Sequence, residues 1–260
     1  MEKLGIDVSH YQKTINWGKV ARDNKTFAIL KCQYEAQSHR IDETFEYNYA
    51  EAGKAGLARG VYIFIASASM ADMQGDANSL LKHLNGRKLE YGIWLDLEAD
   101  IVRSKGKAYI RGLTNTYGQI FRAAGYYMGV YCNRDWYMNV IHDDLKANYD
   151  FWIARYPSND RGVYNPNSSL KPNPKMAVAW QYSSKGHVNG ISGNVDLDVD
   201  YDGIVNLTAP DRKTNAEIAL EVLAGKWGTK TSRPSRKQLL TAAGYDYEAV
   251  QYIVNKLKKG

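Results

Sequence analysis

The chain has 260 residues, an apolar content of 44% and a formal net charge of +6. No apolar run approaches the roughly 18 residues of a membrane span, so we expect no membrane insertion. Two cysteines, Cys32 and Cys132, are too few for a disulfide framework, and both fall in apolar runs typical of buried thiols. Residues 211–260 contain ten Lys and Arg against five Asp and Glu, but no dense basic stripe with interleaved aromatics, which disfavours nucleic acid and leaves an anionic membrane surface or cell-wall polymer as a partner.

Short β-rich runs recur along the first 200 residues and predict eight strands. They are Leu4–Val8, Phe27–Gln33, Val61–Ala66, Gly92–Glu98, Tyr127–Cys132, Phe151–Arg155, Ala177–Tyr182 and Val195–Asp200. Helical patterns over Asp42–Ala55, Ala71–Leu84 and Lys107–Ala123 lie between several of them. The alternation of strand and helix predicts a parallel α/β barrel. It should be irregular, because residues 157–176 hold four of the six prolines and predict a long loop.

The sequence pattern changes near residue 207, where the series of predicted strands ends. The sequence predicts a barrel domain over residues 1–206, a linker over 207–213 and a small three-helix domain over 214–260. The helix signals are the capping pairs Thr214 with Glu217 and Ser235 with Gln238, the stops Gly225 and Gly244, and the start Asp246. Some 47 residues make a marginal core, so we expect tight packing with Trp227 as an anchor.

The run YGIWLDLE carries two carboxylates at strand spacing. Alternation along a strand places Trp94, Asp96 and Glu98 on one face and aliphatic residues on the other. In a barrel the aliphatic face meets the helices, so the acids look inward near the carboxyl end of the strand, where such barrels keep their active sites. Crowding and burial would raise one pKa and supply a proton donor beside an ionised partner. The alternative is a pair of exposed acids at a strand end.

The first and last predicted strands also carry acids. Asp7 either reaches the same cavity or is an ordinary surface acid, and Asp196, Asp198 and Asp200 share one face of the last strand. A calcium loop is an alternative for that last segment, but it would place Ala209 where the bidentate glutamate belongs. The five histidines show no zinc-ligand spacing, and no serine-hydrolase or phosphate-loop motif is present. We therefore expect acid chemistry without a metal or cofactor.

Aromatic residues with a polar group dominate, with 20 Tyr and 6 Trp against 5 Phe. Sugar faces stack on such rings, and several rings fall in or just after predicted strands, where they would line a groove at the barrel mouth or pack in the core. The candidates for substrate contact are Tyr62, Tyr131, Trp152, Tyr156, Trp180 and Tyr182, together with Gln181.

Seven segments in a fixed order carry a resemblance to a known family. They are GIDVSHYQ, GVYIFIAS, YGIWLDLE, GVYCN, FWIARYPS, AVAWQYSS and GISGNVDLDV. With acids at Asp7, Asp96, Glu98 and Asp196, the series resembles glycoside hydrolase family 25, the Chalaropsis-type lysozymes of phages and bacteria, over residues 1 to about 206. The resemblance implies an irregular (β/α) barrel that hydrolyses the β-1,4 bond between N-acetylmuramic acid and N-acetylglucosamine in peptidoglycan strands.

Carried over position by position, the resemblance implies that Glu98 is the general acid/base, Asp96 its partner carboxylate, and Asp7 and Asp196 supporting acids. Asp198 falls where related sequences often carry Asn and is left out of this set. The family is similar to retaining enzymes in which the substrate's own 2-acetamido oxygen attacks, with Asp96 orienting it. Direct attack by Asp96 is the alternative.

The tail resembles the small three-helix cell-wall-binding repeat at the C-termini of some phage lysozymes, on EVLAGKWG, TAAGYDY and AVQYIVNKL. The implied ligand is a muropeptide, with Trp227 and Tyr245 as wall contacts. The segment between Trp227 and Ala242 is longer than in the usual repeat. One copy binds weakly, so a homodimer would raise avidity and stands beside a monomer as a possibility.

The expected function is that of a phage or prophage endolysin. The start MEKLGIDVSHYQ lacks the features of a signal peptide, so we expect synthesis in the host cytoplasm and action on the wall after release by another protein. One alternative is a barrel that binds wall glycan without cutting it, which requires a missing catalytic acid, and none is missing. Another is a bacterial autolysin with the same chemistry, which neighbouring genes would distinguish.

Overall fold

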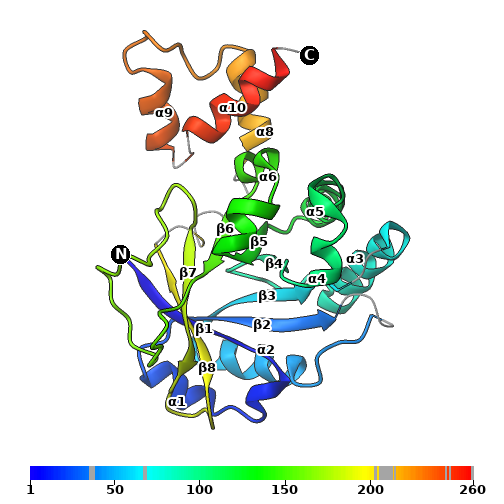
Figure 1. Ribbon diagram of the computed structural model, residues 1–260, viewed down its shortest axis with the longest axis vertical. Coiled ribbons are helices and arrows are strands. Elements are labelled where there is room, and N and C mark those ends of the chain that lie inside the picture. Colours follow the sequence, from blue (N-terminus) through cyan, green and yellow to red (C-terminus); the bar gives the residue numbers. More distant parts are fainter. Residues whose placement is uncertain are drawn as a thin grey trace. The chain divides into compact units, whose positions relative to one another are not determined.

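The computed structural model describes residues 1–34, 39–66, 69–201, 204, 213, 215–243, 245 and 247–258 (Figure 1). The chain divides into two compact units, one formed by Met1–Ile141 with Asp150–Pro210 and the other by His142–Tyr149 with Asp211–Gly260. Each has a hydrophobic core of its own. Among the helices that the structure describes, none is long and apolar enough to cross a membrane.

The first unit is a closed barrel whose eight strands follow one another in sequence order. The strands are β1 (Lys3–Val8), β2 (Phe27–Tyr34), β3 (Ala58–Phe64), β4 (Ile93–Asp96), β5 (Met128–Asn133), β6 (Phe151–Ala154), β7 (Ala179–Gly186) and β8 (Val195–Asp200). All eight predicted strands are therefore confirmed, with their ends shifted by a few residues.

The prediction of a parallel barrel is wrong for the last strand. β1 to β7 run parallel to their neighbours, whereas β8 is antiparallel to both β7 and β1. Only residues 187–194 connect β7 to β8, which is shorter than the dozen or so residues that a parallel crossover needs. The hairpin reverses β8, so the beginning of this strand lies beside the carboxyl end of β1, and Asp196 pairs with Asp7.

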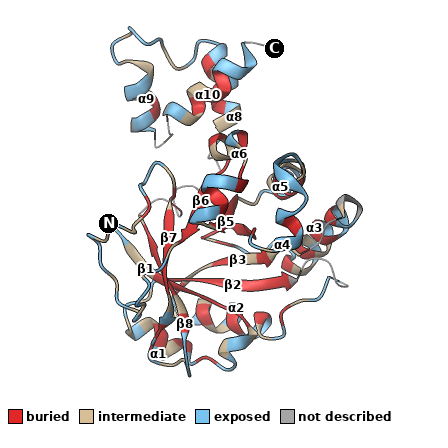
Figure 2. Ribbon diagram, in the orientation of Figure 1, coloured by how far each residue is buried: buried red, intermediate tan, exposed pale blue. Residues whose placement is uncertain are grey.

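Helices cover the outside of the barrel. They are α1 (Trp17–Arg22), α2 (Phe45–Lys54), α3 (Met70–Leu84), α4 (Asp100–Arg103) and α5 (Gly106–Ala123), with short turns η1 (His10–Gln12) and η2 (Trp136–Val140). In α5, residues spaced by three or four, including Ile110, Leu113, Tyr117 and Phe121, are buried, while the outer face of the helix is exposed (Figure 2). The three predicted helices are present, and no helix or strand lies within 157–176, as expected for a long loop.

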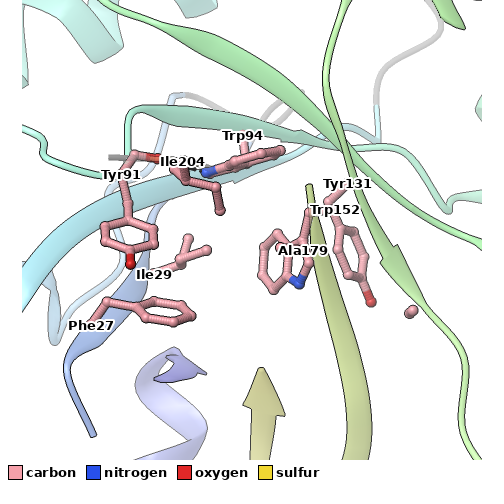
Figure 3. Close-up of a cluster of buried hydrophobic side chains, with 9 residues drawn as sticks. Phe27, Ile29, Tyr91, Trp94, Tyr131, Trp152, Ala179 and Ile204 are labelled. Carbon is pink, nitrogen blue, oxygen red and sulfur yellow. Dashed lines mark hydrogen bonds between the residues drawn. The ribbon is translucent and has the colours of Figure 1, made fainter. Parts of the chain in front are cut away.

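The interior of the barrel is filled by aromatic rings (Figure 3). Phe27 and Tyr91 stack with their centroids 4.3 Å apart, and Trp152 meets Trp94 edge to face at 5.9 Å and Tyr131 at 4.5 Å. Such aromatic pairs stabilise the fold by more than the apolar area that they bury. The prediction that Trp94 faces inward is confirmed, and the packed rings form a rigid base beneath the polar end of the barrel.

The strand that carries the central acids begins at a position that requires glycine. Gly92 has a φ of +64°, and a Cβ at this position would lie 2.5 Å from a carbon of the Tyr127 ring. Both the left-handed backbone and the close ring exclude a larger residue. The turn fixes where β4 enters the sheet and hence where Asp96 leaves it.

The second unit contains four helices among its described residues: α6 (Asp143–Asn148), α8 (Asn215–Leu223), α9 (Arg236–Ala242) and α10 (Tyr247–Leu257). Its core consists of Ala147, Ile218, Ala219, Val222, Leu240, Val250, Ile253 and Val254. Three predicted tail helices are present, and the capping box of Ser235 with Gln238 is formed. Gly225 follows α8 with a φ of +80°, as expected of a helix stop. Trp227 packs against this core.

Several sequence-based predictions for the tail fall outside the described residues: the linker 207–213 except Lys213, and the positions Thr214, Gly244 and Asp246. The boundary at residue 206 therefore stays a prediction. The inclusion of His142–Tyr149 in the second unit was not predicted. Inside that unit, the Asp144 carboxylate of α6 accepts hydrogen bonds of 2.8 Å from Tyr252 and Lys256 of α10.

Candidate active site

Four predicted acids lie at one end of the barrel. Asp7 is near the end of β1, Asp96 ends β4, Glu98 follows it by two residues, and Asp196 is the second residue of β8. Asp7 and Asp96 are each 6% exposed, Asp196 is half-buried and Glu98 is exposed. In a closed barrel these strand ends lie close together. The structure therefore places two buried acids beside two acids that reach solvent.

A fifth carboxyl belongs to the same cluster. Asp198 is fully buried and accepts a hydrogen bond of 2.9 Å from the indole Nε1 of Trp152. Its charge is one of the causes that raise the pKa of Asp7, while a hydrogen bond with Asp7 lowers the pKa of Asp198. The resemblance left Asp198 out of the predicted site. The signal that could have included it is strand alternation, which places Asp198 on the same face of the last strand as Asp196.

Gln181 connects the acids to the aromatic residues. Its Nε2 donates to Asp7 Oδ2 at 2.5 Å, and its Oε1 accepts from the hydroxyl of Tyr131 at 2.8 Å and from that of Tyr156. Because Gln181 is 3% exposed, these partners fix the orientation of its amide. One oxygen of Asp7 is thereby held in place by a buried donor.

Burial raises the pKa of every acid in the cluster, and it is the largest cause for each. The pKa of Asp196 rises to about 6, through burial and then through the charges of Glu98 and Asp160. For Glu98 the carboxyl is sheltered enough for its pKa to rise although the residue is exposed, and Lys31 opposes the rise. A carboxyl with a raised pKa keeps its proton to a higher pH, which suits an acid of this cluster to donate that proton in general acid catalysis.

Among the acids of this cluster, Asp96 is affected by both its burial and its charged neighbours. The charges of Glu98 and Asp196 add to its burial in raising its pKa, and the charge of Lys31 opposes them. Its Oδ1 is buried without a hydrogen-bond partner among the described residues. A buried acceptor without a donor is costly in a free protein, so this oxygen is available to a donor on a bound substrate.

Lys31 was not predicted as a site residue. It lies on β2, is 8% exposed, and its Nζ stands 5.5 Å from the ring centroid of Tyr62 and 5.0 Å from that of Phe64. The signal in the sequence was a single lysine within the otherwise apolar run FAILKCQY. Fully buried lysines are rare unless they are paired.

Comparison with known proteins identifies the family. Residues 6–191, most of the chain, match the model of glycosyl hydrolases family 25. The chain belongs to family 25. Residues 216–257 match the CW_7 repeat. The resemblance predicted from the seven ordered segments is confirmed.

The relatives of this family 25 chain include lysozyme M1 of Streptomyces globisporus, which is 30% identical over 203 residues. That alignment covers 74% of this chain and 65% of the relative, so the chain spans about two thirds of the length of lysozyme M1. The fold is similar to the endolysin CTP1L, with a TM-score of 0.65, 24% identity and coverage of 85% of this chain and 78% of that one. It is also similar to the modular autolysin LytC of Streptococcus pneumoniae, with a TM-score of 0.64, 26% identity and coverage of 77% and 47%.

The aromatic candidates divide into two groups. Tyr62, Tyr131 and Trp152 belong to the interior cluster beneath the family 25 acids, and Tyr156 is 37% exposed beside them. Because Gln181 faces inward, its neighbours Trp180 and Tyr182 face the other side of β7. There they lie against Tyr164, at centroid distances of 6.2 and 5.1 Å, and they are 2% and 4% exposed. The structure places Trp180 away from the acids, whereas Tyr182 lies near enough to Asp198 for that charge to add to burial in raising the pKa of Tyr182.

Trp227 and Tyr245 lie together in the second unit, with their rings edge to face at 5.9 Å. The Trp227 indole donates to Glu221 Oε2 at 2.9 Å. For the calcium alternative, Asp198 and Asp200 are buried strand residues, while Asp202 and Gly203 lie outside the described residues. Within the described part of the chain, no group of three His, Cys, Asp or Glu could hold a metal ion.

Proposed function

We propose that this family 25 chain is an N-acetylmuramidase, which hydrolyses the β-1,4 bond between N-acetylmuramic acid and N-acetylglucosamine in peptidoglycan. The observation that carries the proposal is the pairing of two unlike acids at the end of β4. Asp96 is buried and one of its oxygens has no hydrogen-bond partner among the described residues, whereas Glu98 is exposed with a raised pKa. One side chain is placed to orient a substrate and the other to exchange a proton with it.

In the first step, protonated Glu98 donates its proton to the glycosidic oxygen as the bond from that oxygen to C1 breaks. The carbonyl oxygen of the 2-acetamido group of the muramic acid attacks C1 from the opposite face and closes a five-membered ring. The buried Oδ1 of Asp96, which lacks a partner among the described residues, accepts the acetamido N–H and stabilises the positive charge that develops there.

In the second step, ionised Glu98 removes a proton from water as the water oxygen attacks C1 and opens the ring. Two inversions leave the configuration at C1 retained. Asp7, held by Gln181, and Asp196 lie beside the reacting acids, and in their ionised forms they supply a negative field that supports the cationic transition state. The exposed ring of Tyr156 and the half-buried ring of Tyr62 offer surfaces for the sugars.

The second unit holds the protein on the wall. Its match to the CW_7 repeat, the basic composition of residues 211–260, and the paired rings of Trp227 and Tyr245 support binding to a muropeptide of an anionic wall. Together with lysozyme, endolysin and autolysin relatives, these features support the role of a phage or prophage endolysin acting on the wall after release, with a bacterial autolysin as the alternative.

The test is release of reducing ends from purified Gram-positive peptidoglycan by the intact chain, by Glu98→Gln and by Asp100→Asn. Asp100 is an exposed acid two residues further along and serves as the matched control. Mass spectrometry after borohydride reduction identifies the new end. We expect reduced muramic acid ends, near-complete loss in Glu98→Gln, and no loss in Asp100→Asn.

The competing hypothesis is a barrel that binds wall glycan without cutting it. It gains support if neither the intact chain nor Glu98→Gln releases ends while both sediment with walls. Reduced glucosamine ends would instead show a different bond specificity. A covalent sugar adduct on Asp96, trapped with a fluorinated substrate, would replace the substrate-assisted step by direct attack.

A further inference from the structure

The short helical turn η1, residues 10–12, lies on the rim of the barrel at its acid end, and the steps proposed above do not use it. The turn begins three residues after Asp7. The side-chain Nε2 of Gln12 donates to the backbone oxygen of Asn194 at 3.3 Å, two residues before Asp196. The turn is therefore joined to β1 and to the start of β8, the two strands whose acids Asp7 and Asp196 pair in the cluster.

A buried carboxylate fixes the first residue of the turn. Oδ2 of Asp42 accepts from the backbone N–H of His10 at 3.1 Å and lies 2.9 Å from its Nδ1. Burial would raise the pKa of Asp42, but hydrogen bonds from Thr44 and then from His10 hold it below its usual value, so Asp42 accepts as a carboxylate. The backbone N–H of Asp42 in turn donates to Cys32 O of β2 at 2.8 Å. The imidazole of His10 is thus held in one orientation by a group anchored to the sheet.

The ring of Tyr11 packs against this fixed imidazole. The two ring centroids are 4.2 Å apart, and Tyr11 is nevertheless 76% exposed. One exposed ring is ordinary on a protein surface. Here, however, the ring lies beside the acid cluster, its neighbour is held by a buried charge, and a capping box of Ser9 with Gln12 fixes the turn. The His10–Tyr11 pair is therefore a preorganised aromatic surface with polar edges, which is the composition that suits a sugar.

We propose that the His10–Tyr11 pair is a saccharide subsite, which binds a sugar of the glycan strand beyond the two sugars that flank the cleaved bond. The proposal rests on the proposed function, because it takes the glycan strand as the ligand. Three residues of chain span at most about 11 Å, so one strand can contact both Asp7 and this pair. The apolar face of a pyranose would stack on Tyr11, and its hydroxyls would reach the polar atoms of both side chains. A stem peptide is the competing occupant.

The first test measures binding without cutting. The full chain with Glu98→Gln is titrated by calorimetry with a peptide-free tetrasaccharide of alternating N-acetylglucosamine and N-acetylmuramic acid. Adding Tyr11→Ala should weaken binding by about three- to tenfold, the effect of losing one aromatic contact. Tyr11→Phe, which keeps the ring, should retain most of the affinity. The matched control is Tyr47→Ala, which removes an exposed ring from α2 and should bind as the parent does.

His10→Ala should weaken binding by a similar factor, and the double variant with Tyr11→Ala should lose little more, because the two rings act as one unit. Circular dichroism checks that each variant is folded. The proposal is overturned if the tetrasaccharide does not bind the Glu98→Gln chain, or if Tyr11→Ala binds it as tightly as Tyr47→Ala does.

The second test compares steady-state kinetics on glycan strands with and without their stem peptides. Tyr11→Ala should raise KM by the same three- to tenfold on both substrates and leave kcat near the wild-type value, because the subsite binds ground state and transition state alike. A loss confined to strands that carry peptides would assign the pair to the stem peptide and refute the saccharide subsite. If the wild type cuts neither substrate, the proposed function fails, while the calorimetric test still decides whether His10 and Tyr11 bind sugar.

Discussion

The substitution Asp196→Asn should stabilise the barrel at neutral pH. The pKa of Asp196 rises from an ordinary 3.8 to about 6 in the folded protein, because the carboxyl is buried and because Glu98 and Asp160 repel its charge. A carboxyl with a raised pKa contributes its full stability below pH 3.8 and loses it as pH rises through 6. Two pKa units at about 1.36 kcal/mol each correspond to a loss of about 3 kcal/mol by pH 8. Asparagine does not ionise, so the variant avoids this loss.

The measurement is urea unfolding of wild type and Asp196→Asn at pH 4 and pH 8. Five of the six tryptophans, all except Trp227, lie in the first unit, so their fluorescence reports mainly on the barrel. We expect similar free energies of unfolding at pH 4 and a variant more stable by up to about 3 kcal/mol at pH 8. Activity should fall, since a supporting acid is lost.

The control is Glu51→Gln, which removes the partner of Lys54 in an exposed ion pair on α2. An exposed pair of this kind contributes less than about 1 kcal/mol, so the control should show no pH-dependent gain. If Asp196→Asn gains no more between pH 4 and pH 8 than Glu51→Gln does, then burial and repulsion do not strain this carboxyl, and the argument is wrong.

Three further predictions concern stability. Tyr91→Phe removes the hydroxyl that donates to the buried Asp200 at 3.0 Å, so urea unfolding should show a loss of about 1.5 to 3 kcal/mol, with unchanged activity per folded molecule. Gly129→Ala places a Cβ 2.4 Å from the Trp94 ring and should cost about 1 to 3 kcal/mol by overpacking, visible as a lower melting temperature. Ser235→Ala breaks the capping box of α9 and should cost about 1 kcal/mol in the second unit, measured by circular dichroism, with weaker wall sedimentation.

The strands and the acids were predictable because both depend on local alternation. Ile93 and Leu95 face one way and Trp94 and Asp96 the other, which is readable from four letters of sequence. The direction of β8 was not readable in the same way, because an antiparallel strand has the same alternation as a parallel one. The length of the connection over 187–194 held that information.

For two of the aromatic residues, strand alternation would have corrected the prediction of a substrate contact. Trp180, Gln181 and Tyr182 are consecutive, so they cannot all face the same cavity. Gln181 bonds to Asp7 inside the barrel, while the two rings pack against Tyr164 outside it. Tyr164 belongs to the long loop after β6, and no local pattern relates that loop to β7.

Gln33 could not be placed from the sequence for a different reason. Phe27, Ile29 and Lys31 face inward by plain alternation, but a bulge at Cys32 turns Gln33 outward, and a bulge is a property of the pairing between two strands rather than of either strand alone. The grouping of His142–Tyr149 with the tail is also non-local, since the Asp144 carboxylate meets residues more than 100 positions away. In both cases the decisive partner is distant in sequence.

The two ends of the barrel interior have opposite effects on the stability of the fold. At the acid end, raised pKa values mean that the folded state is destabilised by ionisation, and Asp96 keeps a buried oxygen without a partner among the described residues. Further along the axis, the rings of Phe27, Tyr91, Trp94 and Trp152 bury large apolar surfaces against one another. A barrel encloses both in one sheet, so stability gained from the rings offsets the cost of the acids. Substitutions that relieve the acids should therefore raise stability and lower activity, whereas substitutions in the ring cluster should lower stability first.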